Sequence, residues 1–182
     1  MKKLIVFLAA LILAAVPVLS LAEVDSYPLR WGMTTDEVKA VVGKDLYYPK
    51  EYTDPVHGKV NLYNYSNRKV GEFTGSVLSL FFYNNSLSFK TYQLLDNTKG
   101  DKQASLQRDL EKEYGKGGMD FKMLSPVIES LLETAIPEAD LRALTLAGNI
   151  RFATWKTEND NIVVVNLNAG DGSRTFLVYY PD

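Results

Sequence analysis

Hydrophobic residues recur along the chain with helical spacing in some stretches and with alternating spacing in others, and the two spacings predict where helices and strands lie. The first helix is predicted over 35–42, where a valine stripe has helical spacing and Gly43 follows as a stop. Thr34 and Glu37 stand three residues apart at its start, which is the spacing of a capping box. The residues expected to be buried on this helix are Val38, Val41 and Val42.

Alternation of hydrophobic and polar residues predicts six strands, in two groups of three. In the first group, Asn84-Asn85 separates two alternating runs and tolerates the positive φ angles of a tight hairpin turn. On the strand after this turn, Leu87 and Phe89 are expected to share one face. Residues 44–59 are rich in Tyr, Pro and Asp and are predicted to form a loop. The predicted strands are 60–65, 76–83, 87–95, 151–157, 162–168 and 175–180.

Three further helices are predicted between the two groups of strands. The first is capped by Asp101 and runs to residue 114, with leucines at four-residue spacing on its apolar side. The second is predicted to open at Ser125-Pro126 and to run to residue 134, because proline suits the first helical position. Pro137 is expected, for the same reason, to open the third helix, which runs to residue 146.

Helices clustered against an antiparallel sheet make an α+β domain, and we expect residues 23–182 to form a single one. The two halves, 27–96 and 97–182, share an order of elements, since each has a helix ending in Gly-Lys, an irregular stretch and three strands. The second half carries a helical insert at about 120–147. The sequence leaves open whether the halves are two tandem helix-plus-three-strand units from a duplication or share only this order.

The first 22 residues have the layout of a secretory signal peptide. Lys2 and Lys3 form a charged start, residues 4–18 are almost entirely apolar, and Ser20 and Ala22 are small residues at the cleavage positions. The apolar run is too short to span a bilayer core of about 30 Å comfortably as a helix. We therefore expect cleavage after Ala22 and a secreted or periplasmic location.

Composition excludes several classes of function for the released chain. Removal of 22 of the 182 residues leaves 160, and loss of the two leader lysines leaves 18 basic against 22 acidic residues, a formal net charge of −4. No run of Lys and Arg follows the leader, so nucleic acid is not an expected partner. The chain has no cysteine, which excludes disulfides, thiol chemistry and a lipid anchor at the cleavage point. No stable membrane anchor is expected after cleavage.

The start of the first helix resembles the opening of a known group of exported proteins. Residues 29–38 read LRWGMTTDEV, and Val42-Gly43 closes the helix. A similar Gly-Met-Thr, acidic, Val, Gly signature occurs in outer-membrane assembly lipoproteins of the SmpA/BamE type and in proteins shaped like the β-lactamase inhibitor protein. The resemblance covers about fifteen residues, together with the helix-then-strands order of the whole chain. It implies one or two αβ units, with helices on an antiparallel sheet, that contact another protein. The chain lacks the anchoring cysteine of the lipoproteins and shows no inhibitory loop.

Candidate catalytic residues are few. His57 is the single histidine of the chain, and Asp54 stands three residues before it. A hydrolase site built on His57 and Asp54 is the alternative function, but no Gly-x-Ser-x-Gly stretch is present to position a serine nucleophile. One histidine and no cysteine exclude the usual structural zinc site. We therefore predict no catalytic residue, no metal ligand and no cofactor.

Aromatic residues on the predicted strands give the one positive indication of function. Tyr63, Tyr65, Phe81 and Tyr83 lie on strands whose two faces receive alternate side chains. If helices cover one face of the sheet, the other face presents aromatic side chains to a partner. The sequence therefore predicts an exported, non-enzymatic binding or interaction module, with another protein of the cell envelope as its partner.

Overall fold

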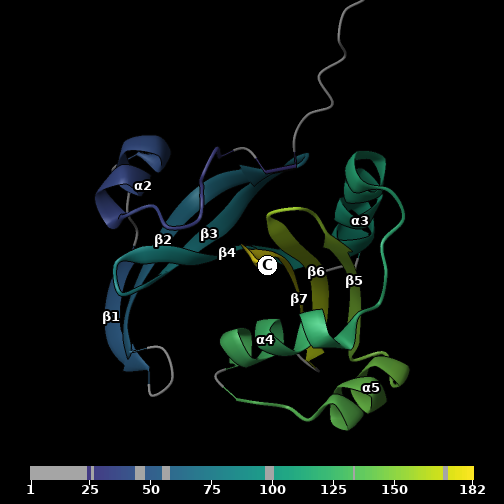
Figure 1. Cartoon of the computed structure of the whole chain (residues 1–182). Coiled ribbons are helices and arrows are strands. Elements are labelled where there is room, and N and C mark those ends of the chain that lie inside the picture. The colour runs from purple at the N-terminus through teal and green to yellow at the C-terminus, as the bar shows by residue number, and fades with distance from the viewer. Residues whose placement is uncertain are drawn as a thin grey trace, which may run out of the picture.

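The structure is a computed structural model that describes residues 24–25, 27–43, 48–54, 58–96, 101–132, 134–169 and 172–182. Along these residues one helix precedes a group of four strands, and three helices precede a group of three strands, as Figure 1 shows. The helices are α2 (Thr35–Val42), α3 (Asp101–Tyr114), α4 (Phe121–Leu132) and α5 (Glu138–Leu146). The strands are β1 (Tyr48–Asp54), β2 (Gly58–Val70), β3 (Phe73–Tyr83), β4 (Ser86–Asp96), β5 (Ile150–Lys156), β6 (Asp160–Ala169) and β7 (Gly172–Pro181).

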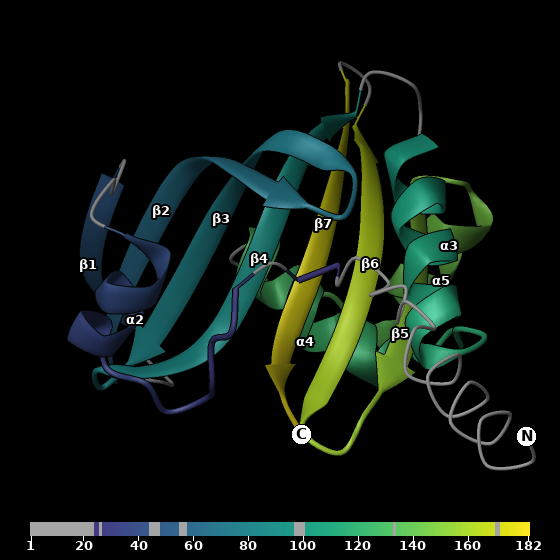
Figure 2. The ribbon, with the colours of Figure 1, turned by 90° about the horizontal axis from the view of Figure 1, so that it is seen from above.

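All seven strands form one sheet in the order β1-β2-β3-β4-β7-β6-β5, and every neighbouring pair is antiparallel. The first four strands follow one another as a meander, and the last three form a second meander (Figure 2). Strands β4 and β7 join the two. The α+β class predicted from the sequence is confirmed.

Helices cover both faces of the sheet, so the protein has two hydrophobic clusters (Figure 1). We call the two sides the α2–α3 face and the α4–α5 face, after the helices that pack on them. The cluster on the α2–α3 face includes Tyr65, Leu78, Leu80, Phe82, Tyr92, Leu106, Leu110, Val164 and Leu177. The cluster on the α4–α5 face includes Phe89, Leu124, Ile128, Leu141, Phe152, Val163 and Val178.

The segment before α2 crosses the α2–α3 face, and we call its residues 24–25 and 27–33 the N-terminal strap (Figure 2). At one end of the strap, Val24 is buried and its carbonyl oxygen accepts a 3.0 Å hydrogen bond from the amide of Gly71. At the other end, Gly32 donates to the carbonyl of Leu87, and the amide of Leu87 donates to the carbonyl of Met33. The strap is therefore hydrogen-bonded to the sheet at both ends.

Helix α2 begins and ends where the sequence predicts. The amide of Thr34 donates to Oε2 of Glu37 at 2.7 Å, and the Thr34 hydroxyl accepts from the Glu37 amide, which completes the capping box. Val38 is 0% exposed, as expected, but Val41 is 38% exposed and does not belong to the buried stripe. The prediction for Val41 was wrong because Val41 and Val42 lie about 100° apart around the helix axis, and the side of α2 that packs on the sheet contains Val38 and Val42.

The two valines provide a matched test of how α2 is held. Val38→Ala removes two methyl groups from a filled site, so we expect it to lower the free energy of unfolding by about 1–2 kcal/mol. Val41→Ala removes the same atoms from a partly solvated site and is expected to cost less than about 0.5 kcal/mol. Urea denaturation of both variants measures the difference. Equal losses would contradict the docking of α2 through Val38.

Three predictions about the elements are corrected. Residues 44–59 do not form one loop, because 48–54 are strand β1, paired with β2 from Tyr48 opposite Asn64 to Asp54 opposite Gly58. This strand lies at the edge of the sheet, where Pro49 is tolerated. Helix α4 begins before the predicted proline, since the Asp120 carboxylate accepts from the amide of Lys122 at 2.8 Å and caps the helix there.

The third correction concerns the register of β4. Leu87 and Phe89 were expected to share a face, but Leu87 packs on the α2–α3 face and Phe89 on the α4–α5 face. A bulge at this point causes the change, because Phe81 pairs with Phe89 while the next residue of β3 pairs with Leu87. An extra residue in one strand moves the following side chains to the opposite face.

Candidate functional site

The four aromatic residues predicted to contact a partner lie on opposite faces of the sheet. The register of β2 and β3 puts Tyr63 and Tyr65 on the α2–α3 face, and Phe81 and Tyr83 on the α4–α5 face. Tyr65 is 0% exposed, so it is a core residue and not a contact residue in this structure. Tyr63 is half-buried, and its ring lies 5.3 Å from that of Phe82. Phe81 and Tyr83 are also half-buried and remain candidates for contact.

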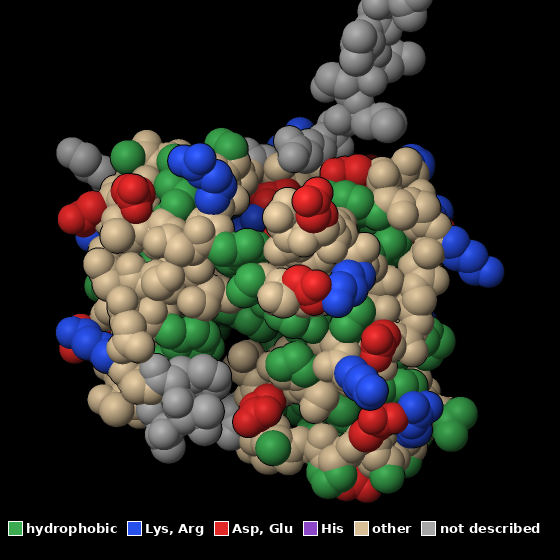
Figure 3. Space-filling view, viewed as in Figure 1, with side chains coloured by type: hydrophobic (Ala, Val, Ile, Leu, Met, Phe, Trp, Pro, Cys, Tyr) green, Lys and Arg blue, Asp and Glu red, His purple; other side chains and the backbone are tan. Residues whose placement is uncertain are grey.

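Phe81 and Tyr83 belong to a part of the sheet that none of the helices α2 to α5 covers. Helices α4 and α5 pack on β5 and β6, and they leave the same face of β2 and β3 open (Figure 1). Figure 3 shows the surface hollowed between this part of the sheet and α4, with hydrophobic side chains beside the hollow. We call this surface the open face, and its half-buried side chains are Leu62, Asn64, Val77, Ser79, Phe81 and Tyr83.

A row of aromatic rings connects the open face with α4. Phe81 meets Phe89 edge to face at 5.4 Å between ring centroids, and Phe89 stacks on Tyr180 at 6.0 Å. The hydroxyl of Tyr180 donates to the carbonyl of Met123 in α4 at 2.9 Å. Burial, together with the negative charges of Asp120 and Asp182, raises the pKa of Tyr180 to about 12, so this hydroxyl keeps its proton and its hydrogen bond at neutral pH.

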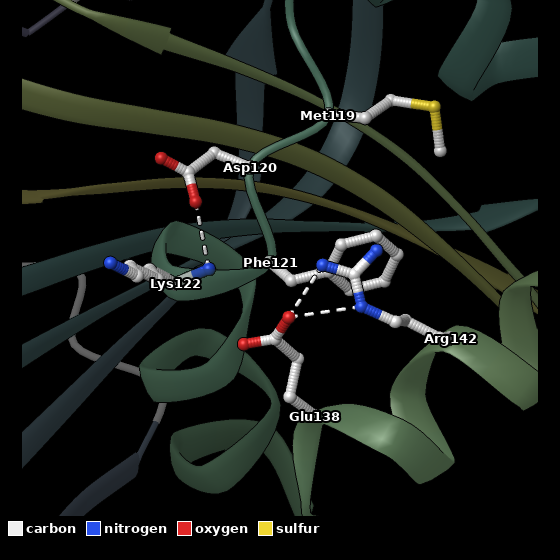
Figure 4. A pocket seen from close by; sticks show the side chains of 6 residues that line it. All are labelled: Met119, Asp120, Phe121, Lys122, Glu138 and Arg142. Atoms are coloured by element: carbon white, nitrogen blue, oxygen red, sulfur yellow. Dashed lines mark hydrogen bonds and ion pairs between the residues drawn. The ribbon is translucent and has the colours of Figure 1, made fainter.

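A cavity of about 290 Å³ lies where the start of α4 meets α5 (Figure 4). The guanidinium of Arg142 covers the ring of Phe121 at 4.2 Å and donates to Oε1 of Glu138 from Nε at 2.9 Å and from Nη2 at 2.5 Å. The carboxylate of Asp120 is used by the capping bond to the amide of Lys122. The contact of Arg142 with Phe121 joins the two helices. The lining contains no hydroxyl, thiol or imidazole that would act as a nucleophile or its base. The lining residues are Met119, Asp120, Phe121, Lys122, Glu138 and Arg142.

The residues of the alternative hydrolase site are not placed by the structure. His57 lies outside the described residues, and for Asp54, the last residue of β1, only the backbone is described. Within the described ranges, no group of three or more His, Asp and Glu side chains is arranged to hold a metal ion. A site at His57 and Asp54 therefore stays a prediction, tested by His57→Ala in any assay that detects hydrolysis.

A buried ionic cluster on the α2–α3 face was missed by sequence reasoning. Lys90 is 4% exposed, and its ammonium pairs with Oδ2 of Asp25 in the N-terminal strap. Oδ1 of Asp25 accepts a 2.6 Å hydrogen bond from the hydroxyl of Tyr92, and the Lys90 ammonium lies 4.4 Å from the ring centroid of Tyr179. Burial first, and the Asp25 charge second, raise the pKa values of Tyr92 and Tyr179, so both phenols stay protonated at neutral pH.

The sequence does contain a signal for this cluster. Lys90 is the one charged residue among residues 86–95, and a lysine in the middle of a strand needs an acidic partner if it is buried. The partner, Asp25, is 65 residues away and lies in a segment without regular secondary structure. Spacing along the chain therefore could not identify the pair.

Comparison of the chain with protein-family models, curated proteins and solved structures gives no match. The resemblance to the SmpA/BamE-type proteins and to the β-lactamase inhibitor protein therefore rests only on the segment 29–43 and on the order of helices and strands along the chain. Among the described residues, no helix is both long enough and apolar enough to span a membrane.

Proposed function

We propose that the protein is an exported, non-enzymatic binding module whose open face contacts another protein of the cell envelope. The observation that supports this most directly is that α4 and α5 leave β2 and β3 uncovered on one face, with Leu62, Phe81 and Tyr83 only half-buried there. An apolar surface surrounded by polar residues on a folded protein is typical of a contact site for another macromolecule. Aromatic residues are enriched in the centres of such contacts.

The charges favour a protein over a nucleic acid as the partner. The six residues that define the open face carry no charge, and the released chain has a net charge of −4. Nucleic acids and anionic lipids bind to concentrated positive charge, which this surface lacks. The open face carries Phe, Tyr, Leu, Val, Ser and Asn side chains. A partner protein with apolar and hydroxyl groups on its own surface would pack against the first four and form hydrogen bonds with the last two.

We also propose that the chain consists of two related units. The first unit is α2 with β1–β4, the second is α3 with β5–β7, and α4 and α5 correspond to the insert at about 120–147. Support comes from the position of α2 and α3 on the same face of the sheet and from the meander formed by the strands of each unit. The first unit has four strands instead of the expected three because β1 precedes them. This arrangement agrees with the family resemblance of the segment 29–43.

A photo-crosslinking amino acid in the open face tests the binding proposal. Ser79 is half-buried on the open face, and Ala104 is exposed on α3, on the other side of the sheet. We expect a benzoylphenylalanine at position 79 to give a discrete adduct in the native cell envelope, because the partner covers this side chain, and the same residue at position 104 to give none. Mass spectrometry of the adduct identifies the partner. The same adducts from both positions, or none from position 79, would contradict the proposal.

Export is tested separately by intact mass. We expect the protein recovered from outside the cytoplasm to begin at Glu23, because Ser20 and Ala22 provide the small residues that a signal peptidase requires. Ala22→Tyr is expected to block this cleavage, while Leu19→Tyr, at a position that the peptidase does not select for size, leaves it intact. A full-length mass that still includes Met1 would exclude cleavage after Ala22.

A further inference from the structure

Two unpaired polar groups lie side by side on the α2–α3 face. Nε and Nη2 of Arg68 and the hydroxyl of Tyr65 are buried from solvent and have no hydrogen-bond partner. The guanidinium carbon of Arg68 lies 5.4 Å from the centroid of the Tyr65 ring. Buried polar groups in proteins are nearly always paired, and an unpaired donor is costly to bury. Two such residues in contact therefore offer donors that a ligand with acceptor oxygens would satisfy.

A distortion of the sheet brings these two side chains together. Tyr65 pairs with Leu78 and Arg68 pairs with Ser76, so β2 spans three residues where β3 spans two. In a regular strand, positions 65 and 68 point to opposite faces. The extra residue, together with the positive φ of 55° at Asn67, turns Arg68 to the face of Tyr65. Bulges that redirect a side chain in this way are frequent beside functional sites.

The backbone of Arg68 is held by a hydrogen bond, while one edge of its guanidinium has none. The hydroxyl of Ser76 is buried and donates to the Arg68 carbonyl oxygen at 2.7 Å. Among the described residues, no carboxylate pairs with the Arg68 guanidinium. The residue as a whole is half-buried, so part of the side chain already reaches the surface. A ligand would approach the unpaired edge, and the Tyr65 hydroxyl on the same face, from this side.

We propose that Arg68 and Tyr65 form a binding site for a carboxylate group. Nε and Nη2 form one edge of the guanidinium, and their two parallel N–H groups match the two oxygens of a carboxylate. The hydroxyl of Tyr65 supplies a third donor for one of these oxygens. A single positive charge matches the single charge of a carboxylate better than the double charge of a phosphate. The site lies on the face opposite the open face, so it is independent of the proposed function.

The resonance of the Arg68 Nε–H group provides a direct test. Sodium acetate is titrated into the ¹⁵N-labelled mature protein, and sodium chloride of equal ionic strength is the control. We expect a saturable shift of the Arg68 Nε–H signal with acetate and none with chloride, because a bidentate carboxylate binds this edge and chloride does not. An equal response to both salts, or no response to acetate, would overturn the proposal.

Two variants separate binding from a structural role. Acetate is expected to raise the melting temperature of the wild type, because it binds the folded state. Arg68→Lys keeps the charge but loses the edge with two parallel N–H groups, so this rise is expected to disappear in the variant. Arg68→Met removes the unpaired groups and is expected to be at least as stable as the wild type and equally unresponsive. Retention of the acetate effect in both variants would show that the carboxylate binds elsewhere and would overturn the assignment.

The source of the carboxylate is distinguished by a third titration. An N-acetylated Gly-Gly peptide with a free carboxyl terminus is compared with its C-terminal amide and with acetate. Stronger binding of the free peptide than of acetate identifies a protein chain end as the source, and equal binding identifies a small organic acid. Binding of the amide as strongly as the free peptide would contradict a carboxylate site.

Discussion

Replacement of Asp25 by asparagine is expected to lower the free energy of unfolding by about 3–5 kcal/mol. The change leaves the ammonium of Lys90, which is 4% exposed, without its negative partner in an apolar environment. The low dielectric around a buried charge makes the loss of its partner far more costly than at the surface. Urea denaturation of the mature protein measures the effect.

Two controls separate this mechanism from a general effect of removing an acid. Glu51→Gln breaks the exposed pair between Glu51 and Lys59, whose side chains are 60% and 58% exposed, and is expected to change stability by less than about 1 kcal/mol. The double variant Asp25→Asn, Lys90→Met removes both charges and is expected to recover much of the loss. If Asp25→Asn alone were as stable as the wild type, the buried pair with Lys90 would not be the source of the expected loss.

Gly117→Ala is expected to destabilise the protein by about 1–3 kcal/mol through overpacking. A Cβ at this position would lie 2.7 Å from Cζ2 and 2.9 Å from Cε2 of Trp155, and 3.3 Å from Cβ of Ala153. The indole is buried and cannot move away easily, because its Nε1 donates to the carbonyl of Gly115 at 2.8 Å. Urea denaturation followed by tryptophan fluorescence measures the stability, and the same measurement in a Trp31→Phe background reports the environment of the Trp155 ring.

The neighbouring glycine supplies the matched control for this variant. A Cβ on Gly118 would meet Oγ1 of Thr154 at 3.6 Å, which is an ordinary contact distance. Gly118→Ala is therefore expected to cost clearly less than Gly117→Ala, although both residues lie in the same segment beside β5. If the two variants lost the same stability, the contact with Trp155 would not be the cause.

Local signals in the sequence predicted the helices well, because caps and apolar stripes act within a few residues. The capping box of Thr34 and Glu37 is present as predicted, and α3 and α5 run over the predicted residues. Strand β1 was missed because its segment contains Pro49 and no clear alternation, and its conformation depends on pairing with β2. Long-range pairing of this kind has no local signature.

The same limit explains what was missed at the candidate sites. Alternation was expected to put aromatic residues of each strand on both faces, which is so for β3, whereas Tyr63 and Tyr65 of β2 share one face. Only the placement of α4 and α5 decides which face is open. The bulge that brings Arg68 to the face of Tyr65 shifts the alternation of side chains along β2 by one residue. A prediction that assumes uninterrupted alternation places these two side chains on opposite faces. The pair of Lys90 with Asp25 depends on how the strap crosses the sheet.

The position of the N-terminal strap connects the proposed export with folding. The cleavage that we propose after Ala22 would place the new chain end one residue before Val24, which is 2% exposed, and two residues before Asp25, the partner of Lys90. The residues nearest to this chain end therefore belong to the packed part of the fold. A cleavage site displaced by only a few residues toward the C-terminus would remove the partner of Lys90 and leave a buried ammonium unpaired.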